Sequence, residues 1–488
     1  MHVHNIPSLQ GGAKQPQTAR KVSILRCKML ISLGGLAALA SLESLTISEC
    51  PNLMTVVPSD DHHQSSGGAL LPESLTDLTI KDCGFLDTYM GRCLMGLARL
   101  SELRLLKCQH MTSLPTVEEL MHLTSLKILQ IEEFDQLVSV GGLHVLLSSL
   151  RFLTVLECPG LFTDLKAAAD VATDPDVDAL STPDHGLSLL ACLGVDNFSL
   201  LPILLSRKGL ESLTTLCLVR SSQNTAFTRE QEEWFQHLHS LRFLIFYKCE
   251  RLPSLPSNLT SLTCLKQLHI RDCPQHMTSL PTAEELMHLT SLKHLSIEEC
   301  ELLVSVGGLH VLLSSLQILG VLKCPGLFTD LKSSADHVAT DNIPDVLDAH
   351  SLSSSFLHLD IDNLSLLPVL FSRKGLLASL SELHFKESSQ DTVFTREEEE
   401  WLQHLPSLHT LTFDKCERLP SLPSDLTSLT RLEHLHILGC PQVSSLPTLP
   451  MSLECLKIRG WHPELERRCQ EGGPLWDLIK HIPDRDFI

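Results

Sequence analysis

Histidine and cysteine are the side chains that most often bind transition metals, and this sequence has 25 histidines and 17 cysteines. His434 and His436 lie two residues apart and Cys440 follows shortly, so one segment offers three metal ligands. The segment alternates apolar and polar residues as a strand does, which points the two histidines outward and Cys440 inward. No two cysteines have the C-x-x-C spacing of a common zinc site. We therefore predict no bound metal and no other cofactor.

Carboxylates that could work in pairs are the next candidates for chemistry. The acidic run Glu397–Glu400 follows Thr395 at the start of an expected helix, where the helix dipole favours negative charge, so a structural role explains it. Glycine-rich phosphate-binding loops, the H-E-x-x-H zinc motif and the G-x-S-x-G nucleophile motif are absent from the sequence. These observations predict a protein that is not an enzyme.

The charge balance argues against two classes of partner. The net charge is −20, whereas nucleic-acid binding and polybasic membrane contacts both need an excess of lysine and arginine. The apolar segment Met29–Leu42 is shorter than the ~20 residues of a membrane span. It also matches Glu301–Leu316, so we expect its apolar residues to lie in a protein core. We predict no nucleic-acid partner and no membrane span.

With catalytic and metal sites set aside, a binding surface is the remaining candidate, and a repeated sequence element must position it. Its clearest copy is Leu265–Pro274, with the pattern L-x-x-L-x-I-x-x-C-P. Further copies are Leu42–Pro51, Leu75–Cys83, Leu100–Cys108, Leu150–Pro159, Leu241–Cys249, Leu292–Cys300, Leu316–Pro325, Leu408–Cys416 and Leu432–Pro441, and looser copies end at Cys27, Phe134, Phe198, Ser221, Leu364, Ser388 and Trp461. Most of these 17 copies are 21 to 28 residues apart, the period of a leucine-rich repeat.

The repeat predicts the fold class, because its L-x-x-L-x-I part alternates like a half-buried strand and every turn of the coil runs the same way. We expect an α/β solenoid: a leucine-rich-repeat horseshoe with a concave parallel β-sheet and a convex side of irregular segments and short helices. Four capping boxes begin at Thr116, Thr228, Thr282 and Thr395. They predict convex helices that include Thr228–Leu238 and Thr395–Leu405, with Trp234 and Trp401 packed inward. The proline-rich returns Leu252–Pro256 and Leu419–Pro423 cannot be helical throughout.

Eleven cysteines occupy the ninth position of the repeat, namely Cys27, Cys50, Cys83, Cys108, Cys158, Cys249, Cys273, Cys300, Cys324, Cys416 and Cys440. We expect each to be buried after its strand and to hydrogen-bond weakly to the backbone of the turn. Such thiols stay reduced in the cytosol, which favours a cytoplasmic location with the nucleus as the alternative.

The chain also contains a long internal duplication. Met111–Cys273 and Met277–Cys440 are two copies of one block, offset by 166 residues and then by 167. Each copy includes a polar excursion, Lys166–Gly186 or Lys332–Ser355, and an earlier polar loop covers Val57–Leu70. We therefore divide the chain into a flexible tail at 1–18, the solenoid at 19–460 and a C-terminal cap at 461–488, in which Trp461, Leu475, Trp476 and Ile479 cover the last leucines.

Between the two copies the outward strand positions diverge, while the other segments are nearly the same. Several pairs change charge or chemistry: Glu157 corresponds to Lys323, Arg220 to Glu387, Tyr247 to Asp414, and Arg271-Asp272 to Leu438-Gly439. Unconstrained drift and diversification for a partner both explain these changes. On the second interpretation the concave face binds protein through Arg104, Gln130, Glu132, Glu133, Glu157, Arg220, Tyr247, His269, Arg271, Asp272, Glu298, Glu299, Lys323, Glu387, Asp414 and His436.

The repeat form resembles the C-terminal leucine-rich-repeat region of plant nucleotide-binding disease-resistance receptors. Matching segments are Leu265–Pro274 with Leu280-Pro281, and Leu432–Pro441 with Leu446-Pro447. The end of the chain, Leu465–Pro483, is similar to the closing segment of those receptors, with Cys469, Gly472, Trp476 and His481-Ile482-Pro483 at matching spacings. The resemblance covers residues 19–488 and implies recognition of a pathogen effector, a host protein that an effector modifies, or a paired receptor.

The nucleotide-binding module and the N-terminal signalling domain of that family have no counterpart in this sequence. Two other readings therefore stay open. The chain could be the substrate receptor of a ubiquitin ligase, although residues 1–18 are short for an adaptor-binding motif. It could also be a truncated receptor fragment without a role of its own.

Overall fold

The computed structural model describes residues 2–4, 19–33, 36–53, 70–84, 87–108, 110–162, 189–204, 210–220, 227–274, 276–313, 315–328, 356–367, 377–388, 394–460 and 463–487. The polar loop at 57–69, both excursions and Trp461 lie outside these ranges. The chain forms two compact units: unit 1 is Met1–Arg220 with Gln236–Leu241, and unit 2 is Ser221–Phe235 with Arg242–Ile488.

Each unit is built on a parallel sheet whose strands follow one another in sequence order. Unit 1 contains β1 (His2–His4), β2 (Lys21–Leu25), β3 (Ser44–Cys50), β4 (Asp77–Cys83), β5 (Glu102–Leu106), β6 (Ile128–Glu132), β7 (Phe152–Leu156), β8 (Cys192–Val195) and β9 (Thr215–Val219). Unit 2 contains β10 (Phe243–Tyr247), β11 (Gln267–Arg271), β12 (His294–Glu298), β13 (Ile318–Leu322), β14 (His358–Ile361), β15 (Glu382–Lys386), β16 (Thr410–Asp414), β17 (His434–Leu438), β18 (Cys455–Arg459) and β19 (Asp484–Phe487). Each of the 17 sequence repeats thus contributes one strand, from β2 to β18.

The strands pair without any shift of register, so the same repeat position stacks on itself from coil to coil. In β11 and β12, Leu268 lies opposite Leu295 and Ile270 opposite Ile297. All four side chains are buried, and the equivalent residues of the other strands continue the column through each unit. One strand and one return segment per turn, stacked in this way, confirm the predicted leucine-rich-repeat solenoid.

Short helices lie in the return segments. The α-helices are α1 (Asp87–Leu94), α2 (Val117–Leu120) and α4 (Leu201–Leu204) in unit 1, and α6 (Arg229–Phe235), α7 (Ala283–Leu286), α10 (Arg396–Leu402), α11 (Pro463–Cys469) and α12 (Trp476–Ile479) in unit 2. The 3-10 helices are η1 (Leu36–Ala38), η2 (Leu143–Leu146), η3 (Pro159–Phe162), η4 (Phe198–Leu200), η5 (Ser257–Ser261), η6 (Leu309–Val311) and η7 (Pro325–Phe328). Leu252–Pro256 and Leu419–Pro423 are not helical, as their prolines predict.

The capping boxes form as expected. The N–H of Thr116, Thr282 and Thr395 each donates to a glutamate carboxylate three residues on at 2.8 Å, and that of Thr228 donates to Gln231 at 2.9 Å. Helices α6 and α10 end three residues before the predicted Leu238 and Leu405, because the chain turns there to bury both leucines. Trp401 is buried as predicted, whereas Trp234 is only half-buried.

Two strands extend the sheet beyond the predicted repeats. At the N-terminal end β1 pairs with Ser23–Leu25 of β2, so His2–His4 form a strand inside the segment that was predicted as a flexible tail. At the other end β19 pairs with β18. Leu475 and Ile479 of the cap are buried, and the Arg485 guanidinium lies over the Trp476 ring at 5.0 Å.

The apolar segment near the N-terminus belongs to the core. Its leucines at 30, 33, 36, 39 and 42 are buried, while Met29 and Ile31 are exposed. The buried leucines confirm the prediction that the apolar residues of Met29–Leu42 lie in the core, whereas Met29 and Ile31 depart from it. Within the described ranges, the structure contains no helix with the length and apolarity needed to span a bilayer.

The residue before each inward-facing cysteine has an unusual backbone conformation. Asp272 has a φ of +55°, and 14 other repeats have a positive φ at this position. The turn lets the Asp272 N–H donate to the Glu298 carbonyl of the next strand at 2.9 Å. Cys273 is buried, and its Sγ donates to the Arg271 carbonyl at 3.6 Å. All eleven ninth-position cysteines make this contact to the carbonyl two residues earlier, as the sequence predicts.

Candidate interaction surface on the open face of the sheet

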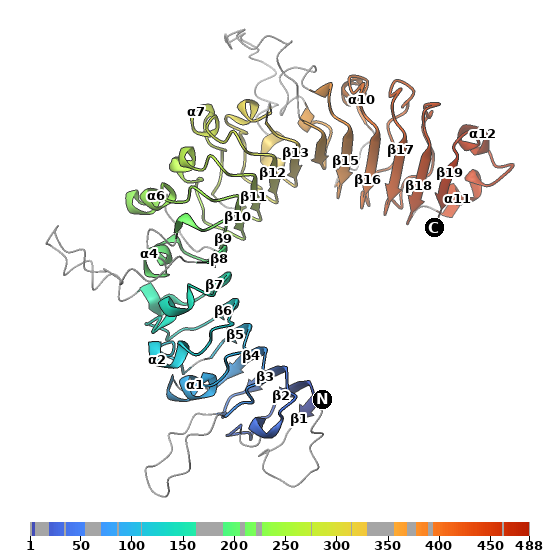
Figure 1. Ribbon diagram of the computed structural model, residues 1–488. Coiled ribbons are helices and arrows are strands. Elements are labelled where there is room, and N and C mark those ends of the chain that lie inside the picture. Colours follow the sequence, from blue (N-terminus) through green and yellow to red (C-terminus); the bar gives the residue numbers. More distant parts are fainter. Residues whose placement is uncertain are drawn as a thin grey trace, which may run out of the picture. The chain divides into compact units, whose positions relative to one another are not determined.

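The exposed side of each sheet, here called the open face, is the face that the sequence analysis expected to be concave. In both units the return helices lie on the far side of the coil from the strands (Figure 1). The predicted contact residues fall into three rows. The middle row, between two core residues of a strand, holds Arg104, Gln130, His269 and His436; the last row, at the strand end, holds Glu132, Tyr247, Arg271, Glu298 and Asp414; the turn row, just after the strand, holds Glu133, Glu157, Arg220, Asp272, Glu299, Lys323 and Glu387. All sixteen side chains are partly or fully exposed.

The turn row is constrained by the backbone. A side chain at positive φ costs roughly 1–2 kcal/mol relative to glycine. The duplicate of Asp272 is Gly439, whose φ is +64°, so this replacement relieves backbone strain without any need for a partner. The interpretation of this pair as surface diversification was therefore incomplete.

Two of the charge reversals occur together and preserve an ion pair. In the first copy Arg220 contacts Glu157 at 2.8 Å. In the second copy the signs are exchanged, and Lys323 contacts Glu387 at 2.6 Å and also Glu299 at 3.2 Å. The attraction between the two positions is thus conserved while their signs are exchanged, which accounts for both reversals within the fold.

The Arg220–Glu157 and Lys323–Glu387 pairs each reach past a strand of only four residues, β8 or β14. There the turn with positive φ is absent, and a carboxylate takes the place of the usual carbonyl. Asp196 accepts the Glu157 N–H at 2.6 Å, and Asp362 accepts the Lys323 N–H at 2.7 Å. Burial raises the pKa of both carboxyls despite these hydrogen bonds. The second oxygen of each is buried and has no hydrogen-bond partner among the described residues.

The strongest difference between the two copies involves residues that the sequence analysis missed. On β8 and β9 the positions on the open face are Cys192, Gly194 (itself buried), Thr215, Cys217 and Val219, and on the duplicate strands β14 and β15 they are His358, Asp360, Glu382, His384 and Lys386. At each of these positions an uncharged residue in the first copy therefore corresponds to a strongly polar or charged residue in the second copy. The buried positions stay apolar, with Leu193 matched by Leu359 and Leu216 by Leu383. Aligning every strand position of the duplication would have found this signal.

The charged group on β14 and β15 is internally bonded. Asp360 accepts from His358 at 2.8 Å and from Lys386 at 2.9 Å, and His384 lies 3.3 Å away. The other ring nitrogen of His358 lies 2.8 Å from Glu382. Burial disfavours the charged form of His358, but its two carboxylate partners outweigh that effect and raise its pKa. For Asp360 burial is likewise outweighed, by the histidines and Lys386, and the pKa is held far below its usual value.

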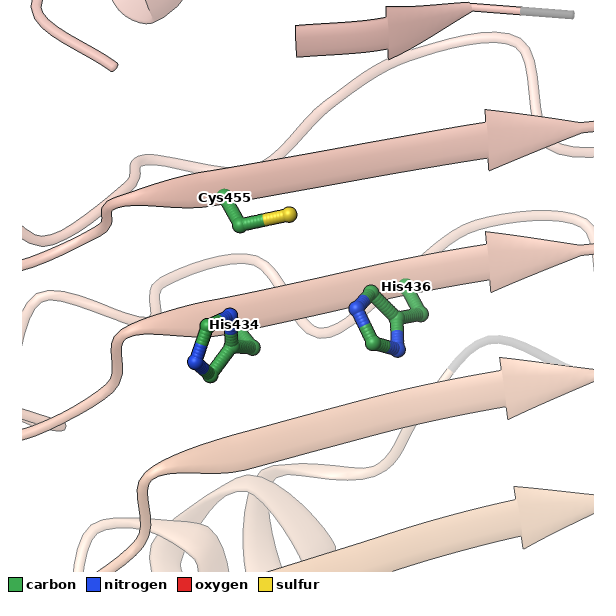
Figure 2. A group of neighbouring side chains, drawn as sticks. All are labelled: His434, His436 and Cys455. Carbon is green, nitrogen blue, oxygen red and sulfur yellow. The ribbon is translucent and has the colours of Figure 1, made fainter. Parts of the chain in front are cut away.

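A second cluster lies on β17 and β18 (Figure 2). Cys440 is buried and faces inward, as predicted. The structure instead brings Cys455, from the next strand, opposite His434 and beside His436. Cys455 lies outside the strand of the two histidines, so the pattern within that one strand did not indicate it. Aligning the repeats shows that Cys455 and His434 occupy the same repeat position.

Chemically, the open face offers fixed rows of charged, aromatic and small side chains on a rigid backbone. A leucine-rich-repeat sheet of this kind is a scaffold suited to binding another protein. The face holds strand side chains in register, so a partner can read several of them at once.

Comparison with known proteins adds a limited similarity. No protein-family model matches the chain. Over 93 residues it is 32% identical to disease resistance protein RPP8 of Arabidopsis thaliana, a match that covers 18% of this chain and 8% of RPP8. Among solved structures it is similar to a leucine-rich-repeat protein of Leptospira interrogans, with a TM-score of 0.45, 18% identity and coverage of 95% of this chain and 96% of that one. TLR13, solved as a complex with ssRNA13, gives a TM-score of 0.46 and 14% identity over 96% of this chain and 67% of its own.

Proposed function

We propose that this chain is a non-enzymatic recognition module of plant innate immunity. It binds a pathogen effector, an effector-modified host protein or a paired receptor through the open face. The similarity to RPP8, a disease resistance protein, supports the role in defence, and the leucine-rich-repeat coil supports protein binding. We place it in the cytoplasm or nucleus, where its 17 free thiols would stay reduced.

One observation carries the proposal. The open face of β14 and β15 differs in chemistry from that of β8 and β9 at all five positions compared above, although the strands beneath keep their apolar core. Unlike the turn-row reversals, this change does not preserve a local ion pair, because Gly194 and Val219 stand where Asp360 and Lys386 stand in the other copy. Exchanging uncharged for charged side chains on one backbone alters partner choice far more than it alters the fold.

The decisive experiment transplants one surface onto the other copy. The variant carries His358→Cys, Asp360→Gly, Glu382→Thr, His384→Cys and Lys386→Val, which are the residues found on β8 and β9. Candidate pathogen-secreted proteins and host defence proteins are screened for binding to the wild type, and each partner is then measured with the variant. We expect at least one partner to lose on the order of 100-fold in affinity, as expected when a few central contacts dominate an interface.

The matched control changes charge on the far side of the same unit. Glu284→Lys on α7 and Glu397→Lys on α10 alter exposed side chains of the return segments. We expect this double variant to bind like the wild type. If the transplant retains every partner, or if the control loses them equally, the open face of β14 and β15 is not the recognition surface.

A further inference from the structure

Three metal-binding side chains from two adjacent strands converge on the open face near the C-terminal end of unit 2. Figure 2 shows His434 and His436 on β17 and Cys455 on β18. One ligand atom from each lies within 4.8 Å of the other two. The parallel register produces this arrangement, because it places His434 directly opposite Cys455.

His436 has one ring nitrogen that the fold leaves unused. Its Nε2 is buried and has no hydrogen-bond partner among the described residues. Its Nδ1 lies 3.5 Å from the hydroxyl of Thr412, a buried residue on the neighbouring strand. A metal-bound imidazole has this division of roles, with one nitrogen held by a hydrogen bond and the other free to coordinate.

Cys455 brings a potential fourth ligand with it. Its side chain is buried, and its Sγ lies 3.3 Å from Oδ2 of Asp484 on β19. Asp484 is the register partner of Cys455, just as Cys455 is the register partner of His434. One imidazole, the thiol and the carboxylate therefore form a row across three strands, and His436 adds a second imidazole.

The cluster on β14 and β15 offers similar side chains but serves as a contrast. There the Asp360 oxygens already accept from His358 and Lys386, and both ring nitrogens of His358 contact carboxylates. A metal ion would have to displace an ammonium group and break satisfied hydrogen bonds. At β17 and β18 it would instead occupy an unused nitrogen.

We propose that His434, His436 and Cys455 bind one Zn²⁺, with Asp484 as the fourth ligand. Imidazole and thiolate favour Zn²⁺ over Mg²⁺ or Ca²⁺, which prefer oxygen ligands. Bonds of about 2.0–2.3 Å in a tetrahedron put ligand atoms roughly 3.3–3.8 Å apart. The ligand atoms of His434, His436 and Cys455 lie within 4.8 Å of one another, so side-chain movements of about 1 Å give these separations.

Binding releases one proton. The Cys455 thiol becomes a thiolate, the S–Zn bond replaces the S–H bond, the proton goes to solvent and the hydrogen bond to Asp484 is replaced by coordination. Zinc affinity should therefore increase with pH.

A bound ion would join β17, β18 and β19 and brace the last coils of unit 2.

The test measures Zn²⁺ and Co²⁺ binding to the full chain purified under reducing conditions and stripped of metal. We expect about one equivalent of Zn²⁺, a thiolate-to-cobalt charge-transfer band with Co²⁺, and a higher melting temperature with zinc. His436→Ala and Cys455→Ser should each weaken binding on the order of 100-fold or more, and Cys455→Ser should abolish the cobalt band.

Matched controls remove the same residue types elsewhere. Cys264→Ser removes an exposed cysteine, and His269→Ala removes the duplicate of His436. Beside His269, Gln267 and His294 occupy the positions that His434 and Cys455 occupy beside His436. Both variants should bind like the wild type. Equal loss in controls and site variants, or no loss in either, would overturn the proposal. Should a site variant fail to fold, X-ray absorption of the zinc-loaded wild type decides, since one sulfur ligand supports the site and two or more refute it.

Discussion

At the scale of single residues, the backbone at the end of each strand decides which side chains the turn row accepts. The φ values there run from +49° at Glu387 to +64° at Gly439. Each such turn directs an N–H toward the next coil, as Lys415 does in donating to the Leu438 carbonyl at 2.7 Å. The strain persists because this hydrogen bond repeats along the unit.

The first prediction concerns this strain. Gly439→Ala should lower the free energy of unfolding of unit 2 by about 1–2 kcal/mol, because alanine must adopt the left-handed conformation. A Cβ there would meet no atom closer than 3.5 Å, so packing adds nothing to the cost. Gly320→Ala is the control, since its nearest contact is also ordinary at 3.4 Å and its φ is not positive. Urea unfolding that gave equal losses for both variants would contradict this account.

The second prediction concerns pH. The raised pKa of His358 means that its protonated form is favoured by folding. The contribution of His358 to the free energy of unfolding is complete below the ordinary pKa of 6.5, and it is lost as the pH rises through the raised pKa. Asp360 stays ionised across this range because its pKa is strongly lowered. The stability lost in His358→Gln should be on the order of 1 kcal/mol in mild acid and should vanish in mild alkali. An NMR titration that placed the His358 pKa at or below 6.5 would refute this.

At the scale of elements, β8 and β14 show how the repeat accommodates a short strand. Both follow an excursion of the chain and both lack the turn with positive φ. Asp196 and Asp362 replace the missing carbonyl and so satisfy the N–H of the preceding turn. The same solution occurs in both copies because the unpaired N–H would otherwise be costly.

The third prediction tests this replacement. Asp362→Ala should destabilise unit 2 by about 1–3 kcal/mol, because the Lys323 N–H loses its acceptor. Asp362→Asn keeps an acceptor and removes a buried charge, so its stability at neutral pH should equal or exceed that of the wild type. Because burial raises the pKa of Asp362, wild-type stability should fall as pH rises from the ordinary value through the raised one, and the asparagine variant should lack this slope.

Hydrogen exchange gives the direct measurement. The Lys323 amide should exchange faster in Asp362→Ala and at the wild-type rate in Asp362→Asn. Equal protection in all three proteins would show that the carboxylate does not hold this amide.

At the scale of the whole molecule, each coil contacts only its neighbours, so stability is local. The cap illustrates the consequence at the end of unit 2. Leu465, Ile479 and Ile482 are buried there and close the leucine column behind β18 and β19. Loss of a cap residue should destabilise the adjacent coils, and this destabilisation should decrease with distance along the solenoid.

The fourth prediction follows from this locality. Ile479→Ala removes fully buried side-chain volume and should cost about 2–5 kcal/mol in the last coils. Hydrogen exchange should accelerate in β17 and β18, while β3 to β6 keep the wild-type rates. Val117→Ala, on the exposed surface of α2, should change neither region. Uniform acceleration along the chain would indicate global rather than local cooperativity.

The sequence by itself determined the features that a single coil can specify. Alternation in Leu265–Cys273 predicts a strand with Leu268 and Ile270 inward, and the capping box at Thr395 predicts a helix start. These follow from local periodicity and local hydrogen bonds, which neighbours in the chain provide. The eleven buried cysteines were predicted on the same ground, because every copy has the same surroundings.

Only the tertiary structure decided which residues meet across coils. Arg220 and Glu157 lie 63 residues apart in sequence, yet they pair because β8 between them is short. Cys455 joins His434 because the parallel register stacks equal repeat positions. Periodicity within one strand carries no information about such partners, since the lengths of the return segments and the register set them. The physical reason is that coiling brings residues one or more repeats apart in sequence into contact. The folded coil is needed to show which side chains meet.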